Sequence, residues 1–116
     1  MEFNGFQDLK VWQKAHQLVL EIYKITKTFP EEEKYCLVNQ IRRSSISISA
    51  NIAEGYRKSK KDFKRYLEIS MASLEETKYH LILSKDLFYL NSKNFEELFG
   101  LSNEVGKMLN GLKNSF

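Results

Sequence analysis

Hydrophobic residues recur along this chain at alternating steps of three and four, the spacing of one face of an α-helix. In the first segment the pattern runs from Val11 to Phe29, and Pro30, the only proline, discourages helical geometry at the residue before it. Three later segments repeat the pattern, so we predict helices over about 8–28, 31–55, 60–90 and 92–114. The positions predicted to face the core are Val11, Ala15, Leu18, Ile22, Ile25, Phe29, Val38, Ile41, Ser45, Ile48, Ile52, Phe63, Tyr66, Leu67, Ser70, Leu74, Thr77, Leu81, Ser84, Phe88, Phe95, Leu98, Ser102, Val105, Leu109, Leu112 and Phe116.

The segment RRSSISISANIAEG, residues 42–55, alternates polar and apolar residues like a half-buried strand. At 100° per residue, however, Ile48 and Ile52 fall on the helical seam, while Ile46, Ala50 and Ala53 form a second stripe on a neighbouring face. A lone strand would leave its backbone groups unpaired. We therefore interpret the segment as a helix with two stripes.

Four long helices with short connections predict an all-α fold, an up-down-up-down antiparallel four-helix bundle, as a single domain over 1–116. Gly55 is expected as the C′ residue of the second helix, where glycine tolerates a left-handed conformation. Ser59-Lys60-Lys61-Asp62 has the form of a capping box that opens the third helix. The acidic run Glu31-Glu32-Glu33 suits the positive end of the dipole of the second helix.

Composition agrees with a folded, globular chain, since 42% of residues are hydrophobic and 28% are charged. Cys36 is the only cysteine, so an intramolecular disulfide is excluded and an oxidising compartment gains no support. The sequence MEFNGFQDLK has neither a basic nor an apolar signal-peptide region, and no apolar stretch approaches the ~20 residues that cross a bilayer. We expect a cytoplasmic protein with no membrane partner.

Two stretches of the chain resemble a known family. They are FQDLKVWQKAHQLVLEIYKITKTFP and EKYCLVNQIRRSSISISANIAEGYRKSKKDFKRYLEISMASLEE, and QIRR followed by SISANIAEG is the most specific part. The sequence is similar to the bacterial four-helix-bundle proteins encoded in 23S rRNA intervening sequences, over roughly residues 6–112. The resemblance implies a homopentameric ring with no established enzymatic activity. It also extends distantly to the accessory variability determinant of diversity-generating retroelements, a similar pentamer that works with reverse transcriptase and nucleic acid.

The residues themselves also indicate a homo-oligomer. The first helix carries apolar residues over roughly 200° of its circumference, whereas a bundle helix needs a stripe of about 100°. The second stripe of the second helix, Ile46, Ala50 and Ala53, adds further apolar surface. Surplus apolar surface usually meets another subunit, although a fully enclosed core helix is the alternative. The apolar residues of the first helix are Leu9, Val11, Trp12, Ala15, Leu18, Val19, Ile22 and Ile25.

Charge is distributed unevenly along the predicted bundle. The half that joins residues 1–18, 43–74 and 105–116 carries +6, and the remainder carries −3, which together give the net charge of +3. We call the positive half the basic pole. Six cations within nine residues, here called the basic cluster, lie at its centre: Arg57, Lys58, Lys60, Lys61, Lys64 and Arg65.

Lysines in the first turn of a helix oppose its dipole, so a phosphate partner would explain the basic cluster. Tyr56, Phe63 and Tyr66 lie among these cations and could stack on unpaired bases. The alternative interpretation is a solvated loop whose aromatic residues belong to the core.

The remaining residues of the family-like motif are expected to have structural or interface roles. Arg42 and Arg43 lie in the middle of a helix and point in different directions, so we favour ion pairs with buried stems. Asn51 and Glu54 are expected to satisfy backbone groups or arginines where the second and third helices meet, just before Gly55.

Signals for catalysis or metal binding are weak. Di-metal bundles use Glu-x-x-His pairs, but Glu76 and His80 are four residues apart, and Cys36 has no histidine nearby in the sequence. We therefore expect no enzyme, no cofactor and no metal. The predicted function is a non-catalytic, oligomeric adaptor that binds RNA or DNA through phosphate contacts, and the alternative is a protein-interaction scaffold that does not touch nucleic acid.

Overall fold

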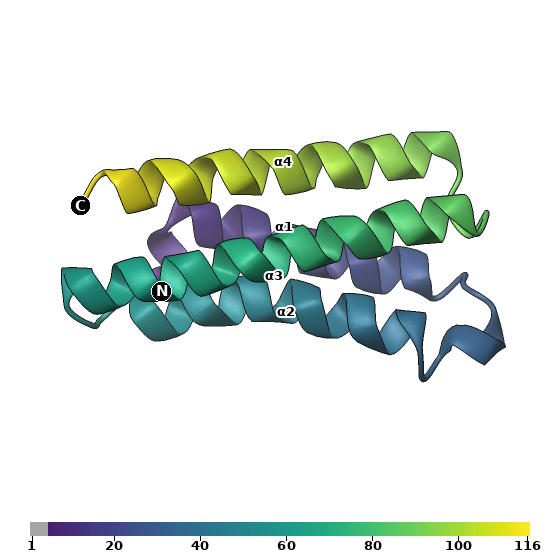
Figure 1. Ribbon diagram of the computed structural model, residues 1–116, viewed down its shortest axis with the longest axis horizontal. Helices are drawn as coiled ribbons and strands as arrows, with labels where there is room; N and C mark the ends of the chain where they lie inside the picture. The colour runs from purple at the N-terminus through teal and green to yellow at the C-terminus, as the bar shows by residue number, and fades with distance from the viewer. Residues whose placement is uncertain (1–4) are drawn as a thin grey trace.

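The computed structural model describes residues 5–116 and shows an all-α four-helix bundle, as predicted (Figure 1). Its helices are α1 (Lys10–Thr26), α2 (Leu37–Gly55), α3 (Lys60–Asp86) and α4 (Ser92–Asn114). Two short 3-10 helices, η1 (Phe6–Asp8) and η2 (Glu31–Glu33), precede α1 and α2. Glu2, which contributes to the charge of the basic pole, lies outside the described residues.

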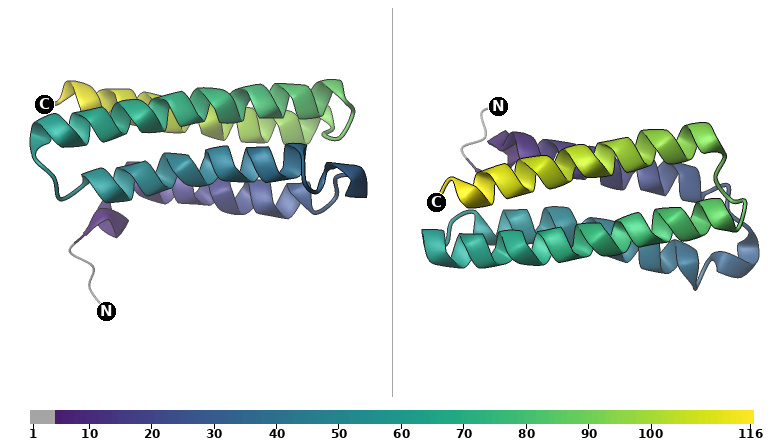
Figure 2. Two further views of the ribbon diagram at one scale, coloured as in Figure 1. Left: turned by 60° about the horizontal axis from the view of Figure 1, so that its bottom comes forward. Right: turned by 45° about the horizontal axis from the view of Figure 1, so that its top comes forward.

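Successive helices run in opposite directions and pack around a common core. The helices α1 and α3 each contact both α2 and α4, which places the four at the corners of a square (Figure 2). The helical periodicity is confirmed at most seam positions: Leu18, Ile22, Ile41, Ile48, Ile52, Leu67, Leu81, Val105 and Leu109 are fully buried. Phe88 and Phe116 are exceptions, since they are 93% and 42% exposed.

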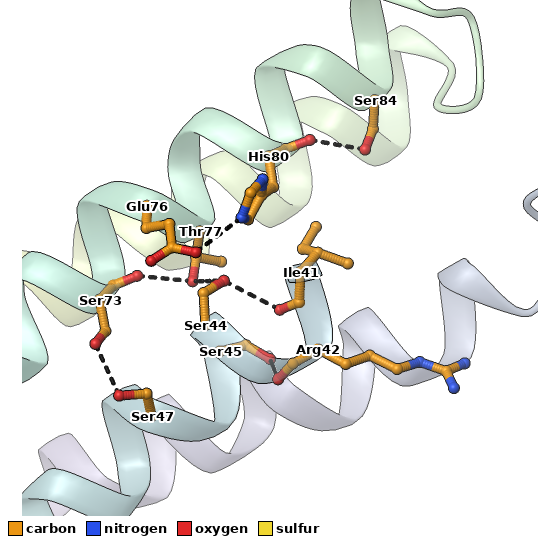
Figure 3. A network of polar contacts seen from close by, with 10 residues as sticks. All are labelled: Ile41, Arg42, Ser44, Ser45, Ser47, Ser73, Glu76, Thr77, His80 and Ser84. Atoms are coloured by element: carbon orange, nitrogen blue, oxygen red, sulfur yellow. Dashed lines mark hydrogen bonds and ion pairs between the residues drawn. The ribbon is translucent and has the colours of Figure 1, made fainter. Parts of the chain in front are cut away.

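Hydroxyl side chains hold α2 and α3 together. Ser70 Oγ donates to the carbonyl of Ile48 at 2.9 Å, and Thr77 Oγ1 donates to Ser44 Oγ at 2.8 Å. Nearer the surface, the hydroxyls of Ser47 and Ser73 lie 2.8 Å apart (Figure 3). These small side chains let the helices approach closely, and each buried hydroxyl that crosses the interface has a partner.

This interface explains the alternating segment of the sequence. Ser44, Ser45 and Ser49 are buried along with Ile48 and Ile52, whereas Ile46 is 41% exposed. A helix therefore places serines toward its neighbours and leaves part of the second stripe at the surface. The helical interpretation of residues 42–55 is confirmed.

Gly55 acts differently from the prediction. It is the last residue of α2 and not a left-handed C′ residue, since the described glycines have no positive φ. A Cβ at this position would lie 2.7 Å from Tyr66 Cβ and 2.9 Å from Phe63 Cδ1. The glycine is needed because α3 passes too close for any side chain.

Two helix boundaries differ from the prediction because of contacts distant in sequence. Residues 31–36 do not open α2, since Glu33 instead accepts a hydrogen bond from Leu37 N at 3.4 Å and another from Tyr89 Oη at 2.8 Å. The helix α3 stops at Asp86 and not near residue 90. Phe88 adopts φ 66°, and the amide of Tyr89 donates to the carbonyl of Ser84 at 2.9 Å, which is a Schellman ending without glycine.

The ends of α1 also lie inside the predicted range of 8–28. Asp8 belongs to η1, and the helix begins at Lys10. At the other end, the helix stops at Thr26. Its Oγ1 donates a hydrogen bond to the carbonyl of Ile22, in the last turn, at 2.7 Å. The predicted ends of α4 agree with the structure.

The wide apolar arc of α1 is largely accounted for within one chain. Val11, Ala15, Leu18, Val19 and Ile22 are buried, and the other three members of the arc are partly buried against the same core. The arc therefore does not by itself provide surplus surface for a second subunit. The exposed apolar residues of α1 are instead Leu20 and Tyr23.

The close contact at Gly55 predicts that a larger residue at this position will destabilise the protein. Gly55→Ala should lower the free energy of unfolding by about 1–3 kcal/mol, because the added Cβ overlaps Tyr66 and Phe63. Gly111→Ala is the matched control in α4, since a Cβ added there would have no neighbour within 4 Å. The control should raise stability by about 0.5–1 kcal/mol. Urea denaturation of both variants measures the difference, and equal changes would contradict the close contact.

Candidate nucleic-acid interface

The basic cluster lies on the tight turn between α2 and α3. The amide of Lys58 donates to the carbonyl of Gly55 at 3.0 Å, which reverses the chain within four residues. Ser59 then caps α3, because its Oγ accepts from the amide of Asp62 at 3.2 Å. This capping bond agrees with the first half of the predicted capping box.

The structure brings all six cations of the cluster to the surface of this turn. Lys60 and Lys61 are the first two residues of α3, and Lys64 and Arg65 follow one turn later. Between residues 5 and 116, the ion pairs that involve lysine lie elsewhere, at Lys14–Glu104, Lys34–Glu31 and Lys78–Glu75. The lysines of the cluster therefore form no ion pair with an acidic side chain among the described residues.

The ends of the other helices meet at the same end of the bundle. The start of α1 and the end of α4 lie beside the α2–α3 turn, as the basic pole requires (Figure 1). Lys10 and Lys107 add exposed cations from these helices. The opposite end holds η2 with its three glutamates and the turn between α3 and α4.

Aromatic residues near the cluster are more enclosed than the stacking hypothesis requires. Phe63 is 7% exposed and packs against Phe116, with ring centres 5.4 Å apart, and edge-on against Tyr56 at 6.2 Å. Tyr66 is half-buried, and Lys58 Nζ and Arg65 Cζ lie 5.7 and 5.8 Å from its ring centre. Phe63 thus belongs to the core, as the alternative interpretation held.

Arg42 has a structural role within the chain, but its partners are neutral. Its Nε donates to Thr26 Oγ1 at 3.0 Å, its Nη2 donates to the carbonyl of Tyr23 at 3.4 Å, and its guanidinium lies 4.4 Å from the Tyr23 ring centre. The side chain points away from α3 toward α1 (Figure 3). It thereby connects the last turn of α1 to the N-terminal part of α2.

The other residues of the family-like motif divide between the helix backbone and the surface. Asn51 Nδ2 donates to the carbonyl of Ser47 at 2.8 Å, so it satisfies its own helix. Arg43 and Ile46 are exposed and line a shallow pocket with Tyr23 and Tyr35. The remaining three are Ala50 and Ala53, both half-buried, and Glu54, which is exposed.

The groups considered for chemistry lie far from the basic cluster. His80 Nε2 lies 3.1 Å from Glu76 Oε2 on α3, where the His80 side chain is only 12% exposed, and Cys36 is exposed just before α2. Within residues 5–116, histidine, cysteine and acidic side chains form no group of three that could hold a metal ion. None of the helices in this range is both long and apolar enough to cross a bilayer.

Sequence and structure comparisons agree on the family. The model of the 23S rRNA-intervening sequence protein family matches residues 7–111. The chain belongs to this family. A family relative of known structure comes from Bacteroides thetaiotaomicron and is described as a protein with unknown function from the S23 ribosomal protein family. It is 30% identical, covers 90% of this chain and 95% of its own, and superposes with a TM-score of 0.83.

The comparisons confirm the resemblance to the intervening-sequence proteins. The distant similarity to the accessory variability determinant stays a prediction. No curated protein matches this family member at a significant level.

The sequence does not predict the hydrogen bond between Tyr89, in the α3–α4 turn, and Glu33 of η2. The hydrogen bond to Glu33 raises the pKa of Tyr89 above its usual value of 10.0, and burial and the charges of Glu33 and Glu32 add to the rise. The sequence related these glutamates only to the dipole of the following helix. The tyrosine gave no periodic signal, because it lies in a turn.

The hydrogen bond between Tyr89 and Glu33 predicts that stability depends on pH in the alkaline range. Because the folded state favours the neutral phenol, the contribution of Tyr89 to stability is present below pH 10 and is lost as pH rises through the raised pKa. Glu33→Gln should lower the pKa of Tyr89, and Glu32→Gln should lower it less. Phenolate absorbance, with Tyr89→Phe to assign the signal, measures both. An equal effect of the two substitutions would contradict the direct bond.

Proposed function

We propose that this protein is a non-catalytic adaptor that binds RNA or DNA by contacts between the basic cluster and phosphates. The observation that carries the proposal is the exposed set of six cations on one turn, away from the acidic end of the bundle. Cations of this kind neutralise phosphates and release counterions, and they read little base sequence.

The position of the lysines supports a role beyond folding. Lys60 and Lys61 occupy the first turn of α3, where each opposes the helix dipole by about 0.3–1 kcal/mol before screening by salt. Acidic residues would stabilise this turn better. A sequence that places lysines here is less stable than it could be, and phosphate binding is a physical reason for that choice.

Assembly of several copies would strengthen such binding, and we propose a homo-oligomer, with the pentamer as the number that the family resemblance implies. Within the chain, the α1–α2 face carries the support: Tyr23 is 36% exposed, Ile46 is 41% exposed, and both line the same shallow pocket. Repetition of the basic cluster around a ring would raise its effective affinity for a long polyanion.

A protein-interaction scaffold is the second candidate. The same α1–α2 face favours it, because Tyr35 is 81% exposed and lines the same pocket as Tyr23 and Ile46. A partner held by apolar contacts would bind with little dependence on salt, whereas phosphate binding falls steeply as salt rises.

Replacing Lys60, Lys61, Lys64 and Arg65 with alanine tests the nucleic-acid function. Affinity for generic RNA and DNA should fall by roughly 100-fold or more, and the salt slope should decrease by about one unit for each phosphate that the variant no longer binds. The variant should unfold at an equal or higher denaturant concentration, because two unfavourable lysines leave the first turn of α3. Fluorescence anisotropy across a salt series, with circular dichroism, measures these effects.

The matched control removes four cations from the opposite end, namely Lys24, Lys27, Lys34 and Lys93, which are all exposed. Both variants lose the same charge, so a general effect of net charge would weaken binding equally. We expect the control to change affinity less than threefold. Equal losses, or no binding by the unmodified protein at low salt, would refute the proposal.

Ile46→Glu tests the oligomer. A charge buried in a subunit interface should reduce the mass measured by light scattering toward the 13.7 kDa of one chain, with unchanged helicity. Ile82→Glu is the control, because Ile82 is 40% exposed on α3, close to the 41% of Ile46. A single-chain mass for the unmodified protein would contradict the proposal.

A further inference from the structure

The aromatic rings of the basic pole are already engaged by the protein. Phe63 is 7% exposed between Tyr56 and Phe116, and the position of α3 against Gly55 keeps it there. At the start of α1, Trp12 stacks on His16 with ring centres 4.9 Å apart and an angle of 8° between the planes. An unpaired base would have to displace one of these contacts to stack.

Tyr66 is the aromatic residue nearest the exposed cations, and two of these cations already lie near its ring. Lys58 and Arg65 both lie within 6 Å of its centre, the range of a cation–π contact. The backbone end of the Tyr66 side chain is also confined. Its Cβ lies so close to Gly55 that a methyl group added to the glycine would not fit between them. Tyr66 therefore does not present a free platform on which a nucleic-acid base could stack.

The most accessible aromatic rings among the described residues lie at the opposite end. Tyr35 is 81% exposed next to the glutamates of η2, and Phe88 is 93% exposed in the turn after α3. This end carries the three glutamates of η2, together with Lys34, whose Nζ lies 5.5 Å from the Tyr35 ring centre. The two most exposed rings thus lie away from the basic cluster, whereas surfaces that bind single strands combine aromatic rings and cations in one groove.

The exposed cations suit a dense, rigid array of phosphates. Four of the six members of the basic cluster are lysines, whose ammonium groups act as point charges without a fixed geometry. A double helix presents about one negative charge per 1.7 Å of its axis and releases about 0.9 counterions per phosphate contact. A single strand releases about 0.7, so equal contacts yield less binding free energy.

We infer that the basic cluster selects the double-stranded form of nucleic acid over the single-stranded form. The selection rests on the proposed function and arises from phosphate density, with no contribution from base stacking. The chemistry shared by its ligands is a pair of closely spaced phosphodiester strands. An RNA duplex and a DNA duplex both provide it.

The test compares strands of one mixed sequence, about 20 nucleotides long and free of self-structure, as single strands and as duplexes of RNA and of DNA. For about five phosphate contacts near physiological salt, the duplex should bind about five- to tenfold more tightly. The log–log salt slope should be about 1.3 times as steep for the duplex. Tighter binding of the single strand would overturn the inference, because each stacked base adds roughly fivefold or more.

Two variants separate phosphate density from stacking. Tyr66→Leu keeps an apolar side chain of similar position, and Phe116→Ala removes the ring at the pole that is 42% exposed. Both should change single-strand affinity less than threefold, with helicity checked by circular dichroism. A tenfold or greater reduction of single-strand affinity in a folded variant would overturn the inference.

The remaining outcomes are also decisive. Preference for the RNA duplex over the DNA duplex, or the reverse, would support the inference and identify the native source of the ligand. Binding of all forms with equal affinity would overturn the selection while leaving the proposed function intact. No binding of any form at low salt would overturn both.

Discussion

The close packing of α2 against α3 is the constraint on which the rest of the molecule depends. Serine and threonine side chains replace larger residues along this interface, and three hydroxyl contacts cross it, at Ser70, Thr77 and the Ser47–Ser73 pair. At its end, Gly55 leaves no space between the helices. The chain can therefore reverse within four residues, and that short turn concentrates the cations at one point of the surface.

The same packing determines what the surface can bind. By holding Phe63 in the core and the Cβ end of the Tyr66 side chain against α2, it limits the exposure of these two rings beside the exposed cations. Lysines in the first turn of α3 oppose the helix dipole and lower the stability of that turn, which supports the proposed binding of phosphates. Structure and charge together support recognition of phosphates in preference to bases.

Much of the fold could be predicted from the sequence because helical periodicity reports burial directly. Val38, Ile41, Ile48 and Ile52 occupy the core as their spacing indicated, and the serine-rich segment is helical. The predicted helix boundaries were wrong where residues distant in sequence decide the local structure. Glu33 accepts a hydrogen bond from Tyr89, and Phe88 adopts a left-handed conformation in a position typical of glycine.

The location of the basic cluster likewise followed from topology, whereas the engagement of the neighbouring rings did not. Periodicity placed Phe63 and Tyr66 on one seam, but Phe63 is buried and Tyr66 is only half-buried beneath cations. Their exposure depends on how closely α3 approaches Gly55, a distance that no sequence pattern encodes. The apolar arc of α1 likewise suggested surplus surface for a second subunit. The bundle of one chain encloses most of that arc, which is more than a stripe of about 100° would need.

Hydrogen–deuterium exchange of the intact protein, with and without a saturating duplex of about 20 base pairs, tests the central claim most directly. If the α2–α3 turn is the binding surface, protection should be confined to peptides that cover residues 56–68, with smaller changes at the adjoining ends of α1 and α4. Protection centred on η2, on the turn after α3 or on the α1–α2 face would contradict the account.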